Sequence, residues 1–189
     1  MKQNIYRTHN CGELRILDVG KEVKIAGFVE TIRDLGGLVF LDIRDIYGIT
    51  QVVTSGAANA TDFASHIPIE SSVTILGTVR KRDEETYNPK IPTGEVEIVI
   101  KDITILGKRT KNLPFEVNVT QEVREDLRLQ YRFLDLRGKK LQDNLKLRAE
   151  VLQYLRMQMI EQGFLEVQTP ILTTSSPEGA RDYLVPSRV

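Results

Sequence analysis

The residues best suited to chemistry lie in a short alternating segment, residues 38–44, with the sequence LVFLDIR. Alternation with a period of two separates its side chains onto the two faces of a strand. One face receives Val39, Leu41 and Ile43, and the other receives Leu38, Phe40, Asp42 and Arg44. An aromatic ring among charges on a sheet can stack on an unpaired nucleobase, worth about 1–3 kcal/mol per base. The alternative is that a loop or a second domain covers Phe40.

Other polar side chains of the same region can recognise the edges of bases. We expect Gln51 on the face of Phe40, and alternation directs Glu97 away from the core. An amide offers a paired donor and acceptor, and a carboxylate accepts from an exocyclic amine. Arg33 and the Arg80-Lys81-Arg82 run add local positive charge. Taken singly, each of these residues can equally be a solvated surface residue.

These side chains require a sheet, and the sequence predicts one. Residues 23–53 contain three strand-like runs separated by turn signals, which indicates a three-stranded meander. Strand patterns recur at residues 72–82 and 95–106, joined by a polar, proline-containing hairpin loop. A helix-permissive segment, residues 57–66, separates the third and fourth strands. This order predicts the partly open Greek-key barrel called the OB-fold, which binds oligonucleotides or oligosaccharides across strands two and three.

The segment ahead of the meander, residues 11–20, is predicted to be a short helix that ends at Gly20. Its apolar residues would close the bottom of the sheet like a plug. These residues are Leu14, Leu17 and Val19.

The second half of the chain has a helical pattern. Residues 107–120 have no sustained periodicity and indicate a linker, and residues 121–137 predict one or two short helices. A long helix is expected over residues 141–162 with Gly163 as its stop. A strand is expected from Phe164 to the break at Pro170, and a last one over residues 182–185. We interpret this half as a second domain that is begun and not completed.

Composition excludes several classes of protein. The 189 residues carry no net charge, and one cysteine with two histidines gives neither a disulfide framework nor a Cys/His metal cluster. No apolar run approaches the roughly 18 residues of a membrane span, and the N-terminus lacks a signal core, so a cytoplasmic location is the default. Residues 1–106 hold 12 Lys and Arg against 15 Asp and Glu, which disfavours an indiscriminate binder of single-stranded DNA.

Three segments resemble bacterial-type aspartyl-tRNA synthetases, which are class II aminoacyl-tRNA synthetases. They are IRDLGGLVFLDIRDIYGITQVV, EDLRLQYRFLDLR and GFLEVQTPILTTSSPEGARDYLVPSRV. The last is the most specific, because it resembles motif 1, whose near-invariant proline, here Pro170, lies at the dimer interface. The resemblance implies a mainly β chain: an OB-fold anticodon-binding domain (residues 1–106), a linker or hinge (107–138) and the truncated start of the α+β class II catalytic domain (139–189).

The resemblance also implies roles for particular residues. It assigns anticodon binding to Arg33, Phe40, Gln51, Arg80 and Glu97. Phe40 would stack on the central uridine, Gln51 and Glu97 would contact base edges, and the arginines would contact backbone or bases. Glu178 would contact the amino group of L-aspartate. The first strand departs from the family pattern, because Phe28 and then Glu30, Thr31 and Ile32 stand where a tryptophan and a basic cluster are common.

The resemblance implies a larger enzyme. ATP and Mg²⁺ would serve the complete enzyme in forming aspartyl-adenylate, from which L-aspartate passes to tRNA(Asp). The motifs that hold ATP would lie beyond Val189, so we expect this chain to be inactive and to bind no cofactor. The complete enzyme would be a homodimer. For this chain we expect weak or absent dimerisation, because Phe164, Val167 and Ile171 lack the rest of their sheet.

Two alternatives remain open. One is a non-catalytic tRNA- or RNA-binding OB-fold module, which would bind RNA without forming an adenylate. The other is the related asparaginyl- or lysyl-tRNA synthetase, which also joins an OB-fold to a class II domain.

Overall fold

The computed structural model describes residues 4–54, 63–172, 174, 183 and 185–186. The chain forms two compact units, Met1–Glu116 and Val117–Val189, and the boundary between them lies inside the predicted linker. No helix among the described residues combines the length and the apolar character that a membrane span requires.

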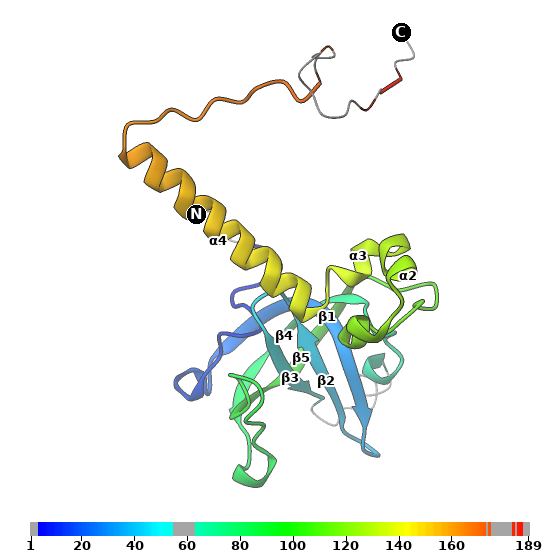
Figure 1. Cartoon of the computed structure of the whole chain (residues 1–189). Helices are drawn as coiled ribbons and strands as arrows, with labels where there is room; N and C mark the ends of the chain where they lie inside the picture. Colours follow the sequence, from blue (N-terminus) through cyan, green and yellow to red (C-terminus); the bar gives the residue numbers. More distant parts are fainter. Residues whose placement is uncertain (1–3, 55–62, 173, 175–182, 184, 187–189) are drawn as a thin grey trace. The chain divides into compact units, whose positions relative to one another are not determined.

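The first unit is a five-stranded barrel (Figure 1). Its strands are β1 (Glu22–Asp34), β2 (Val39–Arg44), β3 (Ile49–Val53), β4 (Ser72–Lys81) and β5 (Val96–Gly107). The predicted meander is confirmed, since β1, β2 and β3 pair antiparallel in sequence, and β4 and β5 form the predicted hairpin. The barrel is closed in the order β1-β2-β3-β5-β4, not partly open as expected. Closure depends on a short parallel pairing of β3 with β5, Val52 with Ile98 and Val53 with Val99.

The alternation of β2 is confirmed by burial. Val39, Leu41 and Ile43 are fully buried in the core, beside Ile25, Ile75 and other apolar residues. The predicted helix over residues 57–66 lies mostly outside the described residues. Its described part is helical at residues 63–65, where Ala64 is buried and Phe63 is exposed. The loop between β4 and β5 contains a single 3-10 turn, η2 (Glu84–Thr86).

A bulge in β1 changes which side chains face the core. Val29 pairs with Ile43 and Thr31 pairs with Asp42, so Glu30 is an extra residue that interrupts the ladder. Before the bulge, odd-numbered residues such as Val29 are buried, whereas after it Ile32 packs against the core. A one-residue insertion exchanges the two faces of a strand. The bulge thereby turns Thr31 and Arg33 to the outside of the barrel.

The segment before β1 differs from the prediction. Its only helical part is the three-residue 3-10 turn η1 (Ile16–Asp18). Leu14 is fully buried, but Leu17 and Val19 are exposed, so Leu14 alone of the predicted plug residues is buried. A longer helix does not form because the backbone N–H of Cys11 bonds to Asp45 in the loop after β2, and the backbone bonds within the segment are short 3-10 bonds, such as Asp18 N–H to Arg15 O at 2.9 Å.

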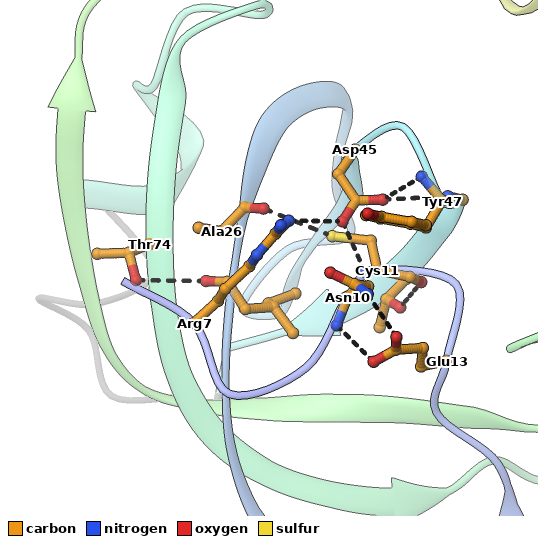
Figure 2. A network of polar contacts seen from close by, with 11 residues as sticks. Arg7, Asn10, Cys11, Glu13, Ala26, Asp45, Tyr47 and Thr74 are labelled. Atoms are coloured by element: carbon orange, nitrogen blue, oxygen red, sulfur yellow. Dashed lines mark hydrogen bonds and ion pairs between the residues drawn. The ribbon is translucent and has the colours of Figure 1, made fainter. Parts of the chain in front are cut away.

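Asp45 holds that segment against the barrel, as Figure 2 shows. Its carboxylate accepts hydrogen bonds from the backbone N–H groups of Cys11 at 3.0 Å and Tyr47 at 2.7 Å, and pairs with Arg7 at 3.4 Å. The two chain segments approach so closely that a Cβ on Gly12 would lie 2.3 Å from the carbonyl oxygen of Tyr47. Only glycine fits at that position.

The described helices of the second unit lie between Val117 and Glu161. It contains η3 (Val117–Glu122), α2 (Glu125–Gln130), α3 (Arg132–Asp135) and α4 (Lys139–Glu161). The two short helices and the long helix are therefore confirmed, and Gly163 ends the last one with φ of +87°. The strand expected at residues 164–170 is wrong, because no strand is formed there. A strand requires a partner to bond with, and the described residues supply none at that place. Of the last predicted strand, only Tyr183 and Val185 are described, and neither is in a strand.

Candidate nucleic-acid interface

A cavity of about 520 Å³ opens on the outer face of the barrel. All five residues predicted to bind the anticodon line it: Arg33, Phe40, Gln51, Arg80 and Glu97. They come from all five strands, because Arg33 is on β1, Phe40 on β2, Gln51 on β3, Arg80 on β4 and Glu97 on β5. The structure therefore brings together residues that are up to 64 positions apart in sequence.

The strand register explains this convergence. Thr31 pairs with Asp42, Asp42 pairs with Gln51, and Glu97 pairs with Arg80. Gln51 and Glu97 each precede one residue of the parallel pair Val52 and Ile98, so they are neighbours too. We call these five residues (Thr31, Asp42, Gln51, Glu97 and Arg80) the cross-strand row. Neighbours across strands lie close enough for their side chains to interact.

Hydrogen bonds connect the side chains of the row. Arg33, which lies beside the row, makes the connection between Asp42 and Gln51. Gln51 Nε2 donates to Glu97 Oε2 at 2.8 Å, and Arg33 Nη2 donates to Gln51 Oε1 at 3.0 Å. Arg80 Nε donates to Glu97 Oε1 at 3.1 Å, and Arg33 pairs with Asp42 at 3.1 Å. Two arginines are thus balanced by two carboxylates. Such an arrangement is suited to recognising a ligand by its donors and acceptors more than by net charge.

Burial separates the centre of the row from its ends. Gln51 and Glu97 are only 6% and 5% exposed, so neither is the solvated surface residue that the alternative allowed. The side chains of Arg33 and Arg80 are 52% and 57% exposed. A half-exposed arginine on a buried acceptor can move toward a ligand, whereas the buried amide and carboxylate are fixed in place. Polar groups enclosed in this way must be paired, and these are.

Phe40 lies half-buried in the lining of the cavity. The exposed side chains of Leu35 and Leu38, from the turn between β1 and β2, line the same cavity. Together they offer an apolar surface beside the polar row. The two leucines were not predicted as site residues, although their exposure in a turn between two strands was a usable signal.

The end of β4 supplies further cations. Lys81 and Arg82 line the cavity. Tyr87, whose ring lies 6.0 Å from Lys81 Nζ, raises the pKa of that amine through a hydrogen bond and its own charge. Within the described residues, Nε and Nη1 of Arg82 have no hydrogen-bond partner although both atoms are enclosed. Enclosed guanidinium N–H groups without an acceptor are costly, so a ligand acceptor would be favourable there.

Other predicted residues lie elsewhere. Pro170 is exposed in the second unit, and Glu178 lies outside the described residues. Cys11 is buried, and burial followed by the charge of Asp45 raises the pKa of its thiol, which makes it unsuited to be a nucleophile. Among the residues that the structure describes, no group of three His, Cys, Asp or Glu could hold a metal ion.

Two family models match the chain. The model "OB-fold nucleic acid binding domain" matches residues 23–106, and "tRNA synthetases class II (D, K and N)" matches residues 124–189. An Aspartate–tRNA(Asp/Asn) ligase of Phenylobacterium zucineum is 50% identical over 98% of this chain. The chain is thus related to bacterial-type aspartyl-tRNA synthetases, as its sequence predicts. It spans 31% of the length of that relative.

Solved structures of synthetases share the fold. An aspartyl-tRNA synthetase from Entamoeba histolytica has a TM-score of 0.79 at 24% identity, covering 93% of this chain and 43% of that one. An asparaginyl-tRNA synthetase from Pyrococcus horikoshii has a TM-score of 0.75 at 27% identity, covering 87% and 38%. The architecture is therefore common to enzymes named for two different amino acids, and the mainly β OB-fold chain predicted from the sequence is confirmed.

Proposed function

We propose that the barrel binds the anticodon of tRNA(Asp), and that the chain is the N-terminal part of an aspartate–tRNA ligase. The observation that carries this is the cross-strand row, which lies beside Phe40 in one cavity of an OB-fold. The chain is 50% identical to a relative named an aspartate–tRNA(Asp/Asn) ligase, which favours aspartate over asparagine or lysine as the amino acid and favours an enzyme over a non-catalytic RNA-binding module.

Each residue of the site has a role in this proposal. Phe40 stacks on the central uridine of the anticodon, supported by the leucines of the neighbouring turn. Gln51 and Glu97 contact base edges with the hydrogen-bonding capacity that their mutual bond leaves free. Arg33 and Arg80 already pair with carboxylates, so their remaining N–H groups suit base acceptors better than phosphates.

The phosphates of the RNA contact Lys81 and Arg82 at the end of β4 in this proposal. The enclosed N–H groups of Arg82 lack an acceptor among the described residues, and Lys81 lines the same cavity. Phosphate oxygens are strong acceptors for both cations. In this proposal the row and Arg33, whose charges balance, recognise the bases, and the end of β4 holds the RNA backbone.

The complete enzyme is proposed to be a cytoplasmic homodimer with Pro170 at its interface. It would comprise the anticodon-binding domain (residues 1–106), the hinge (107–138) and the catalytic domain that begins at residue 139. ATP with Mg²⁺ would supply the activation of L-aspartate, whose amino group Glu178 would contact. No cluster of described residues fits a metal ion.

The proposal is tested by binding the chain to two anticodon stem-loops, one of tRNA(Asp) and one altered only at the central uridine. We expect tighter binding to the first, and we expect Phe40→Ala to remove about 1–3 kcal/mol of that preference. Measurements at low and high salt separate base recognition from phosphate contacts.

Phe63→Ala is the matched control, because it removes an exposed phenylalanine of the same unit that does not line the cavity. It should leave the preference intact. Equal, steeply salt-dependent binding of both loops would contradict anticodon recognition and would indicate contact with phosphates alone.

A further inference from the structure

We propose that Asp42, held by Thr31, is a positioning residue that fixes how Gln51 presents its amide to the ligand. Asp42 acts on Gln51 through Arg33. Thr31, Asp42 and Arg33 need not contact the base that Gln51 contacts. This inference rests on the proposed function of the cavity, and it names the residues on which discrimination between bases depends.

The contacts form a chain from β1 to β5. Thr31 Oγ1 donates to Asp42 Oδ2 at 2.6 Å, and Arg33 Nη2 lies 3.1 and 3.2 Å from the two carboxylate oxygens of Asp42. The same Nη2 donates to Gln51 Oε1 at 3.0 Å. Glu97 Oε2 then accepts from Gln51 Nε2 at 2.8 Å. Each link is a hydrogen bond to a charged group or to the amide.

The chain of contacts determines which end of the Gln51 amide points which way. Its oxygen faces a guanidinium, which only donates, and its nitrogen faces a carboxylate, which only accepts. A reversed amide would oppose donor to donor and acceptor to acceptor. The ligand therefore meets one donor–acceptor pattern and not its mirror image.

Asp42 is needed because Arg33 alone would not hold this arrangement. The Arg33 side chain is 52% exposed, whereas the Asp42 side chain is 20% exposed and is anchored by strand pairing to both Thr31 and Gln51. Without the carboxylate, an arginine with several rotatable bonds would leave Gln51 Oε1 for solvent or phosphate. The bulge at Glu30 is what brings Thr31 and Arg33 to this face.

The test uses Asp42→Asn in the full 189-residue chain, with the same two stem-loops. Loss of a group within one hydrogen-bond network should lower the preference for the matched loop by about three- to tenfold. Affinity for the altered loop should not fall, because the substitution removes a negative charge from an RNA-binding face. A merely structural defect would instead weaken binding to both loops alike.

Asp102→Asn is the matched control, since it removes the same charge from an exposed position of β5 outside the cavity. It should leave the preference unchanged. In an Arg33→Gln background, Asp42→Asn should have no further effect on the preference, because the positioning passes through Arg33. Thr31→Val, which keeps the shape of the side chain, should lower the preference by a smaller factor.

The possible failures are distinguishable. If the unaltered chain does not discriminate between the loops, the proposed function fails. If it discriminates and Asp42→Asn and Thr31→Val discriminate equally well, the function stands and the positioning role is refuted. Additive effects of Asp42→Asn and Arg33→Gln would also refute it.

Discussion

The strands of the barrel and helix α4 both carry apolar side chains at regular spacing, but these side chains are buried in the barrel and exposed or half-buried in α4. In the barrel, Ile25, Leu41 and Ile98 are fully buried. In α4, Leu152, Leu155 and Met159 recur at helical spacing, yet none of the residues of this helix is buried. A groove of about 320 Å³ beside them is lined mostly by apolar side chains of α4 and of the segment that follows it.

This difference indicates which part of the chain contributes most of its folding free energy. Closing a sheet on itself satisfies its backbone bonds and encloses one face of every strand. An amphipathic helix satisfies its backbone alone but needs another element to cover its apolar face. The folding free energy of the chain should therefore be concentrated in the barrel, which also holds the proposed site. The following predictions test this, from the largest effect to the smallest.

The largest effect is expected from the charges that surround the β1 bulge. Arg44, buried at 8% exposure, pairs with Glu70 and lies 3.6 Å from Glu30, the bulge residue. Arg44→Met would leave the carboxylates buried without their cation and should cost about 3–5 kcal/mol of unfolding free energy, measured by urea denaturation followed by circular dichroism. Lys139→Met, which breaks the exposed pair with Asp143 in α4, should change it by less than about 0.5 kcal/mol.

A second pair of substitutions compares the apolar residues of the two regions. Ile98→Ala in the barrel core should destabilise the chain by about 2–5 kcal/mol in the same denaturation experiment. Leu155→Ala removes a side chain that is 52% exposed and should cost about 0.5 kcal/mol or less. Equal losses of unfolding free energy in the two variants would mean that α4 is packed as tightly as the barrel, which would contradict the proposed difference between them.

The buried thiol of Cys11 gives the barrel a dependence on alkaline pH. Burial, with a further contribution from the charge of Asp45, raises the pKa of Cys11 in the folded chain above the value of about 8.5 for a free thiol (Figure 2). The unfolded chain therefore loses this proton first, and stability present below pH of about 8.5 is lost as the pH rises.

The measurement is the slope of unfolding free energy against pH. Above a pH of about 9, Cys11 should contribute a loss of up to about 1.4 kcal/mol per pH unit, which Cys11→Ala should remove. Cys11→Ala keeps every tyrosine and lysine of the chain, so their titration cancels in the comparison. Identical slopes for both chains would show that the thiol ionises as readily in the folded barrel as in the unfolded chain.

The smallest effect concerns association through the second unit. We predict weak or absent dimerisation of this chain, so Phe164→Ser should leave its sedimentation coefficient unchanged. Phe164 is 58% exposed and lines the apolar groove. Sedimentation velocity over a range of concentrations measures this directly, and a tight dimer that Phe164→Ser dissociates would overturn the prediction.

Much of the barrel could be predicted because its signals are local. Alternation identified the buried face of β2, turn residues separated the strands, and glycine marked the end of α4. The five candidate site residues were also named from sequence, and the structure brings all of them to one cavity. The η1 segment and the strand at residues 164–170 were predicted wrongly, since their structure depends on partners that are distant in the sequence.

The sequence by itself determined which residues could form the site, where the strands lie along the chain and the relationship to synthetases. Only the tertiary structure decided that Gln51 and Glu97 are enclosed and bonded to each other, that the barrel closes, and that Thr31 and Arg33 face outward. The reason is physical. The extra residue Glu30 exchanges the faces of the side chains that follow it in β1. The register that joins Asp42 to Gln51 and Glu97 to Arg80 is set by pairing between strands, which no local pattern specifies.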